Sequence, residues 1–204
     1  MLGMLSRGIK VLLFVPQVAF GLTLGPIHIE KLFSQADIVA IVQVSEGHLL
    51  GEAEKSCGAR YKGHVEHLFK GDKEDYIDFG NFQGFEIGGR YLLFLSKQKD
   101  GILELYLSMA TDSDEKAFVA DYRNRCEPLL SENHVMHGGN GAMIIKWSSS
   151  LQYNDGVLVP TRFVPIPDSL KSVKAGAEDA ASFEEAVWVR EEEIVQFLKG
   201  LKSQ

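Results

Sequence analysis

Two pairs of histidines in this 204-residue chain are spaced as metal ligands often are. His64 and His67 lie in an alternating run that predicts a β-strand, and side chains three apart on a strand point to opposite faces. We therefore expect one of them to be packed and the other solvated. His134 and His137 lie in a predicted loop near Glu132 and are candidate metal ligands, although no third ligand completes a familiar spacing. A metal-dependent hydrolase that uses this second pair is the enzymatic alternative.

Other residues that could act as nucleophiles, acids or bases have structural explanations. Three serines at 148–150 follow the histidines, but no G-x-S-x-G elbow surrounds them. Asp112, Asp114 and Glu115 stand where a helix is expected to begin, and carboxylates there cap the helix and complement its dipole. The glycines between 80 and 89 lack the spacing of a phosphate-binding loop. The sequence thus predicts a protein that is not an enzyme and has no cofactor.

The N-terminus has the order of a secretory signal. Arg7 and Lys10 precede an apolar run at 11–15, and a small residue follows at Gly21. We expect cleavage after Gly21, which makes residues 1–21 a signal peptide; an uncleaved anchor is the alternative. The apolar run is too short to span a bilayer comfortably, and no later segment approaches the necessary length. The mature protein is therefore expected in the periplasm or secreted, without a stable membrane span.

The charge balance excludes one class of partner. The whole chain has a formal net charge of −7, and removal of the signal takes away two basic residues and leaves about −9. Nucleic-acid binding depends on a basic face that displaces counterions from the phosphates. We therefore expect no nucleic-acid partner. The length is sufficient for one full core and a small appendage.

Cys57 and Cys126 are the only cysteines in the sequence. An even number of cysteines in an oxidising compartment favours a bridge, so we predict a disulfide between them; two free thiols are the alternative. Closing so long a loop would stabilise the fold by roughly 4 kcal/mol on the chain-entropy model. The predicted role of the bridge is structural.

Hydrophobic periodicity predicts a mainly β protein with flanking helices. Runs of alternating or β-branched residues, separated by glycine-rich turns, indicate five short strands with no intervening βαβ helix. This pattern favours a closed antiparallel sheet, and a five-stranded barrel leaves no exposed edge. The predicted elements are a helix at 29–35, strands at 38–45, 59–69, 76–79, 90–97 and 103–108, and a helix at 114–125 with Phe118, Val119 and Tyr122 along one side.

The C-terminal part is less regular. Strands are predicted at 143–147 and 156–160, and a helix at 191–201 has an acidic first turn followed by apolar residues at helical spacing. Residues 171–182 are rich in alanine, glycine and charge, and we interpret them as an exposed connector. The predicted organisation is a signal at 1–21, a barrel domain at 22–127 and a small C-terminal α+β extension at 128–204.

Three stretches follow one another in a familiar order: ADIVAIVQVSEG at 36–47, YKGHVEHLFKG at 61–71 and EIGGRYLLFLSK at 86–97. This order resembles the bacterial branch of the tissue inhibitor of metalloproteinases and netrin-like superfamily. The resemblance covers roughly residues 29–126 and implies an OB-type β-barrel in an exported protein. The matching residues, which we expect to be structural, are Ala36, Asp37, Lys70, Gly71, Gly88, Tyr91, Leu92 and Phe94.

The start of the mature chain differs from that of the animal inhibitors in this superfamily. Their mature chains begin with a cysteine whose amine and carbonyl bind the catalytic zinc of the target. Cleavage after Gly21 would instead expose Leu22, and the first cysteine here is Cys57. The resemblance therefore implies the fold more than this mode of inhibition. The free amine of Leu22 could still contact a metal, so Leu22 is one candidate for partner binding.

Phenylalanines recur every three residues in a glycine-rich stretch, at Phe79, Phe82 and Phe85. Loops at the rim of a barrel commonly carry recognition because the barrel holds them rigidly. These rings are candidates for contact with a protein partner, either a protease or a component of the cell envelope; the alternative is that they plug the end of the barrel. The sequence thus favours a binding protein, with metalloprotease inhibition by a rim loop as a second hypothesis.

Overall fold

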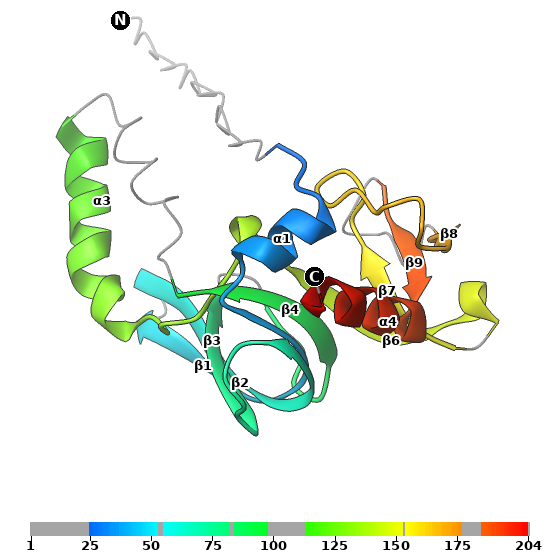
Figure 1. Cartoon of the computed structure of the whole chain (residues 1–204). Coiled ribbons are helices and arrows are strands. Elements are labelled where there is room, and N and C mark those ends of the chain that lie inside the picture. The colour runs from blue at the N-terminus through cyan, green and yellow to red at the C-terminus, as the bar shows by residue number, and fades with distance from the viewer. Residues whose placement is uncertain are drawn as a thin grey trace, which may run out of the picture.

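The computed structural model describes residues 25–52, 55–81, 84–97, 113–152, 154–176 and 185–203. Within these ranges the chain forms one nine-stranded sheet with flanking helices (Figure 1). The signal at 1–21, Leu22, Phe82, the strand at 103–108, Asp112 and the last part of the predicted connector, 177–182, lie outside the described residues.

Five of these strands close into a barrel. They follow the order β1-β2-β3-β5-β4, and β4 pairs back onto β1; β3 and β5 run parallel, whereas the other neighbours in the barrel are antiparallel. The predicted mainly β fold with a five-stranded barrel is therefore confirmed. The strands are β1 (Ile38–Glu52), β2 (Lys55–Lys70), β3 (Tyr76–Asn81), β4 (Arg90–Ser96) and β5 (His134–Val135).

The fifth described strand corrects one prediction. His134 and Val135 were expected in a loop, but their backbones pair with Ser96 and Leu95 of β4, and His134 also pairs with Gly80 of β3. A strand of two residues has no periodicity of its own, so only its partners define it.

Strand β4 and the first half of β1 lie at the centre of the structure and are buried on both faces. Ala40, Val42 and Val44 of β1 point into the barrel, whereas Val39 and Ile41 pack on its outside against the helices. The β1–β2 ladder has four register shifts. Such bulges bend long strands, which allows this hairpin to curl around the barrel.

The C-terminal strands continue the same sheet outward from β4, in the order β4-β6-β7-β9-β8. Here residues 171–182, interpreted as a connector, include a short edge strand at 172–174, because these residues pair with β9; its three side chains are exposed, as expected. The added elements are β6 (Ala142–Ser148), β7 (Asn154–Val159), β8 (Ser172–Lys174), β9 (Val187–Arg190) and the 3₁₀ turns η1 (Glu127–Leu129), η2 (His137–Gly139) and η3 (Ser149–Leu151).

Helices α1 (Ile29–Gln35) and α4 (Glu191–Lys202) cover the outside of β1 and β4 (Figure 1). Helix α1 has the predicted bounds. Side chains from α1, the barrel, β6, β7, β9 and α4 form one apolar cluster. The C-terminal strands and α4 therefore share a core with the barrel.

Helix α3 (Ser113–Cys126) stands at the other end of the barrel, at the left of Figure 1. Val119 is buried on its packed side, but Phe118 is 69% exposed, which corrects the expectation that both line one side. Adjacent residues on a helix point about 100° apart, and burial of Val119 turns Phe118 away. None of the helices in the described ranges is long and apolar enough to cross a membrane.

Candidate functional site

The mouth of the barrel beside the turn at 84–89 is filled by aromatic rings. The ring of Phe85 lies 4.9 Å from that of Tyr61, 5.2 Å from Phe79 and 4.7 Å from Tyr91, measured between centroids. Phe79 is fully buried, and Phe85 is partly buried. Both rings therefore plug the barrel, which was the alternative to partner binding. The prediction that Phe79 contacts a partner is wrong, because its side chain is fully buried. Its burial follows from the alternation of β3, which points Ile77 and Phe79 inward.

The turn at 84–89 is fixed to the barrel by hydrogen bonds. The backbone N–H of Phe85 donates to Tyr61 Oη at 3.3 Å, and that of Glu86 donates to Tyr91 Oη at 3.0 Å. Two further bonds tie the turn to Val44 of β1, from Gly88 N–H to the Val44 carbonyl at 2.7 Å and from Val44 N–H to the Gly89 carbonyl at 2.9 Å. This rim turn is therefore a rigid part of the barrel.

Two large aliphatic side chains stand exposed at this rigid mouth. Leu49 of β1 is 83% exposed and Ile87 of the rim turn is 61% exposed. They lie on the same side of β1: Ile87 Cδ1 is 3.2 Å from the position that a Cβ would take on Gly47, and Leu49 follows Gly47 by two residues. We call Leu49 and Ile87 the rim surface. Sequence reasoning missed both residues, because an exposed leucine or isoleucine has the same local pattern as a buried one.

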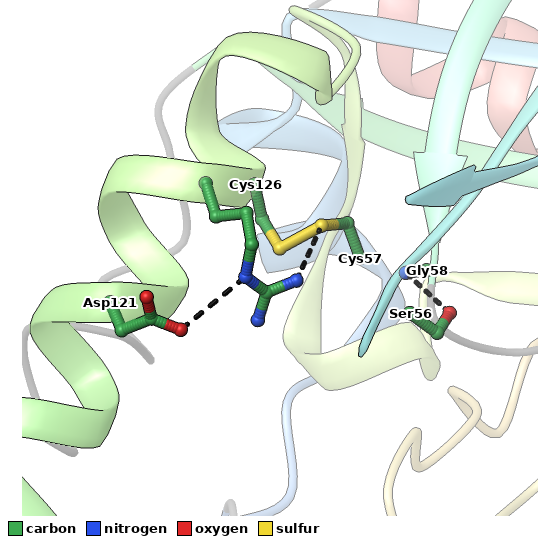
Figure 2. The surroundings of a disulfide bond; sticks show 6 residues. Ser56, Cys57, Gly58, Asp121 and Cys126 are labelled. Atoms are coloured by element: carbon green, nitrogen blue, oxygen red, sulfur yellow. Dashed lines mark hydrogen bonds and ion pairs between the residues drawn. A yellow bond between two sulfur atoms is a disulfide. The ribbon is translucent and has the colours of Figure 1, made fainter. Parts of the chain in front are cut away.

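The predicted disulfide is confirmed and joins β2 to α3 (Figure 2). Cys57 of β2 and Cys126 of α3 have Cα atoms 5.1 Å apart, and neither side chain is exposed. Arg125 Nη1 approaches Cys57 Sγ at 3.6 Å, and Arg125 Nε contacts Asp121 at 3.3 Å. The bridge therefore fixes the C-terminal end of α3 to the outer part of β2.

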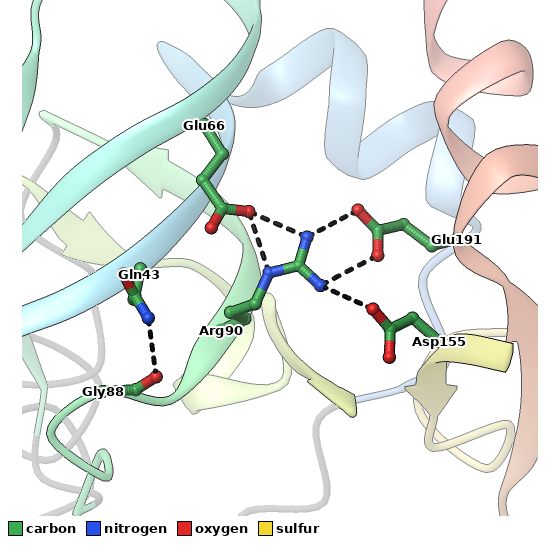
Figure 3. A network of polar contacts seen from close by, with 6 residues as sticks. All are labelled: Gln43, Glu66, Gly88, Arg90, Asp155 and Glu191. Atoms are coloured by element: carbon green, nitrogen blue, oxygen red, sulfur yellow. Dashed lines mark hydrogen bonds and ion pairs between the residues drawn. The ribbon is translucent and has the colours of Figure 1, made fainter. Parts of the chain in front are cut away.

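A second polar cluster centres on Arg90 at the start of β4 (Figure 3). Its guanidinium donates to Glu66 at 2.8 Å, to Asp155 at 3.2 Å and to both carboxylate oxygens of Glu191 at 2.7 and 3.0 Å. Burial alone would lower the pKa of Arg90, but the hydrogen bonds with Glu191 and Glu66 raise this pKa above its ordinary value. The arginine is thus permanently charged and joins β2, β4, β7 and α4. No local sequence signal connects residues so far apart.

The histidine pair His64 and His67 does not form a site. A register shift opposite Ile41 and Val42 leaves Glu66 as an extra residue in β2, and both histidines are exposed, so the expectation that one of them packs is wrong. His64 contacts the ring of Tyr76, with centroids 5.4 Å apart. His67 lines a groove of about 360 Å³ beside the Arg90 cluster.

The other pair, His134 and His137, has no metal-ligating cluster around it in the part of the chain that the structure describes. His134 belongs to β5 and His137 to η2. In the ranges that the structure describes, no group of three or more His, Cys, Asp or Glu side chains could hold a metal ion.

The residues of the superfamily-like motif have structural contacts. Lys70 Nζ donates to the carbonyls of Phe33 and Ser34 at 3.0 and 2.9 Å and so caps the end of α1. Asp37 Oδ2 accepts from the backbone N–H of Lys97 at 2.7 Å. The other motif side chains are buried or shape turns: Ala36, Tyr91, Leu92 and Phe94 in the core, and Gly71 and Gly88 at positive φ.

We compared the sequence with family models and with curated proteins. No family model and no curated protein matches this chain. The likeness to the metalloproteinase-inhibitor superfamily therefore stays a prediction from the motif.

Proposed function

We propose that this chain is an exported β-barrel protein that acts by binding a protein partner through the rim surface. The observation that carries the proposal is the exposure of Leu49 and Ile87 on the same side of β1, next to a turn that hydrogen bonds fix to the barrel. Leaving large aliphatic side chains in water is unfavourable, and burying one stabilises a complex by roughly 1.5–3 kcal/mol. A few such residues commonly supply most of the binding free energy at a protein interface.

The construction of the mouth supports this role. The plug formed by Phe85 and the hydrogen bonds to Tyr61 and Tyr91 hold the rim turn in place before any partner arrives. A preformed surface loses less conformational entropy on binding, which favours affinity. The rim surface alone is small, so we propose that it forms the centre of a larger contact.

The disulfide supports export to an oxidising compartment. Buried bridges persist in the periplasm and outside cells and are rare in the cytosol. A signal at residues 1–21 would direct the chain to that compartment. The proposed partner is accordingly a protease or a component of the cell envelope.

Site-specific photocrosslinking followed by affinity measurement tests the proposal. A photoreactive phenylalanine is placed at position 49, at position 87, or at Val173, an exposed residue of the edge strand β8 that serves as control. We expect the same partner to crosslink from positions 49 and 87 and not from 173. With that partner purified, Leu49→Ser and Ile87→Ser should each weaken binding about tenfold or more, whereas Val173→Ser should not.

The melting temperature separates binding from stability. Because both rim side chains are exposed, their serine variants should keep the wild-type melting temperature. Unchanged affinity in both variants would contradict the proposal. Inhibition of a metalloprotease panel by the wild-type protein, lost on Ile87→Ser, would identify the partner as a protease and support the rim-loop inhibitor hypothesis.

A further inference from the structure

Strand β1 continues well past its pairing with β4. That pairing ends at Gln43, and the last bonds on the same side join Val44 to the rim turn. The strand then runs on to Glu52 (cyan in Figure 1). Among the described residues, only β2 forms backbone hydrogen bonds with residues 45–52. The outer part of β1 therefore has a free edge in the described structure.

The orientation of Val44 shows which backbone groups face this edge. The N–H and carbonyl of Val44 point away from β2, toward the rim turn. A register shift between Val44 and Glu46 leaves Ser45 as an extra residue in β1. Backbone orientation alternates along a strand, so after one extra residue Gly47 and Leu49 share the orientation of Val44. Their N–H and carbonyl groups therefore face the free edge.

The free edge lacks the charged side chains and prolines that commonly protect edge strands. Its residues 47–51 read Gly-His-Leu-Leu-Gly. By contrast, the short edge strand β8 ends at the exposed Lys174 and follows the exposed Lys171. Lysines on an edge strand oppose pairing with a further strand. The edge of β1 is therefore better suited than that of β8 to accept one.

Apolar side chains accompany these free backbone groups. Leu49 and Ile87 are exposed on the same side of β1, and the rim turn that carries Ile87 takes the place of β4 beside Val44. A strand added to residues 47–51 would lie directly beyond this turn. Neighbouring strands place opposite side chains on a common face. Every second side chain of the added strand would therefore face the rim surface.

The charges at the rim favour a basic partner. Glu86 of the rim turn is exposed and forms no ion pair with the described residues, whereas Glu46 lies 3.9 Å from Lys62. The whole chain has a formal net charge of −7, so a second copy would bring like charges together at this edge. A foreign segment that carries a lysine or an arginine fits the edge better than a second copy does.

We propose that the partner of the rim surface contributes an extended segment, which pairs as an added strand with residues 47–51 of β1. Every second side chain of this segment is apolar and packs against Leu49 or Ile87, and a lysine or arginine lies near Glu86. Backbone hydrogen bonds then supply affinity, and the side chains supply specificity. This inference rests on the proposed function and names the kind of partner that the rim surface accepts.

Selection from a phage-displayed library of random linear peptides, about nine residues long, tests the inference on the full protein. Peptides are retained if they bind the wild type at least about tenfold more tightly than Leu49→Ser. We expect retained peptides to alternate apolar and polar residues and to contain a lysine or arginine. In the complex, the amides of Gly47 and Leu49 should exchange with solvent at least about tenfold more slowly than in the free protein, and the Val173 amide should be unchanged.

Methylation of the peptide backbone separates strand addition from contacts of side chains alone. A retained peptide is synthesised in two forms, each N-methylated at every second residue, in opposite alternation. In a paired strand only every second N–H faces a given neighbour. One form should therefore lose about tenfold or more in affinity, and the other should bind nearly as the unmodified peptide does. Equal effects in the two forms would overturn the proposal.

Protection in the free protein would identify a different occupant. If the amides of Gly47 and Leu49 already exchange slowly without peptide, the edge is covered. A second copy covers it if protection increases with protein concentration, and the chain itself covers it otherwise. Either result would overturn the proposal, as would a selection that retains no peptide.

This inference and the proposed function fail in different ways. If the photocrosslinked partner binds Leu49→Ser and Ile87→Ser as tightly as the wild type, the proposed function itself fails. If it loses affinity for both variants but leaves the amides of Gly47 and Leu49 unprotected, the rim surface binds a partner without strand addition. In that case only the present inference fails.

Discussion

The contacts at the junction of α1, β1 and β2 explain why lysine and glycine occupy positions 70 and 71. Lys70 caps α1, and the chain must then turn sharply beside Asp37. Gly71 has a φ of 108°, and a Cβ there would lie 3.2 Å from Ile38 Cγ1 and 3.3 Å from the Asp37 carbonyl. Both backbone conformation and space therefore require glycine at this position.

Gly71→Ala should destabilise the fold by roughly 1–3 kcal/mol, because it adds strain and a tight contact. Gly200→Ala is the matched control: it lies inside α4, and nothing is within 4 Å of its added Cβ. Alanine there should stabilise by up to about 1 kcal/mol through helix propensity. Urea unfolding measures both, and equal effects in the two variants would refute the explanation.

Residue-level reasoning from sequence succeeds where a pattern exists. The motif residues lie in the core, contact the backbone or form turns, and the two cysteines pair. Phe79 shows a conflict between two patterns. It is the first of three phenylalanines that recur every three residues, which suggests a loop, whereas its two-residue spacing from Ile77 predicts an inward face. The structure follows the second pattern. Leu49 carries no signal, because its exposure depends on where the barrel ends.

At the level of elements, strands and helices with clear periodicity could be predicted, and those defined by tertiary pairing could not. Helix α1 and the centres of β1 to β4 follow from apolar patterns. The bulge at Glu66 and the two-residue strand β5 depend on partners distant in sequence. The Arg90 cluster is of the same kind, since it connects four elements through one side chain.

Arg90→Leu should destabilise the protein by roughly 2–4 kcal/mol, because it leaves the carboxylates of Glu66, Asp155 and Glu191 without their partner. The Arg90 side chain is 25% exposed and that of Glu191 is 17% exposed, so solvent screens this cluster only in part. The control is Arg60→Leu, whose ion pair with Asp78 is about half exposed. That change should alter stability by less than about 1 kcal/mol. Similar urea midpoints for the two variants would contradict the assigned role of Arg90.

At the scale of the molecule, one continuous sheet and the disulfide join the segments that the structure describes. The C-terminal strands add to β4 and share a core with the barrel, so the sheet links both halves of the chain. Cys57 and Cys126 are 69 residues apart and join α3 to β2. Both features act between segments that are distant in sequence, and only the cysteine pairing had a sequence signal.

Replacement of both cysteines by alanine should lower the free energy of unfolding by roughly 4 kcal/mol, because the unfolded chain regains the entropy of a long loop. Thermal and urea unfolding measure the loss. Because the bridge is buried, the wild type should also resist alkylation in mild reductant until denaturant is added. Rapid alkylation of the native protein would show that the bridge is accessible and would contradict its structural role.

The bridge also determines what a single cut does to this chain. The loop that it closes includes β3, β4 and most of α3. A protease that cleaved one peptide bond between Cys57 and Cys126 would leave two fragments tied to each other. The product would migrate as one band on a non-reducing gel and as two bands after reduction. In surroundings rich in proteases, a nicked molecule would therefore keep its barrel and α3 in one piece.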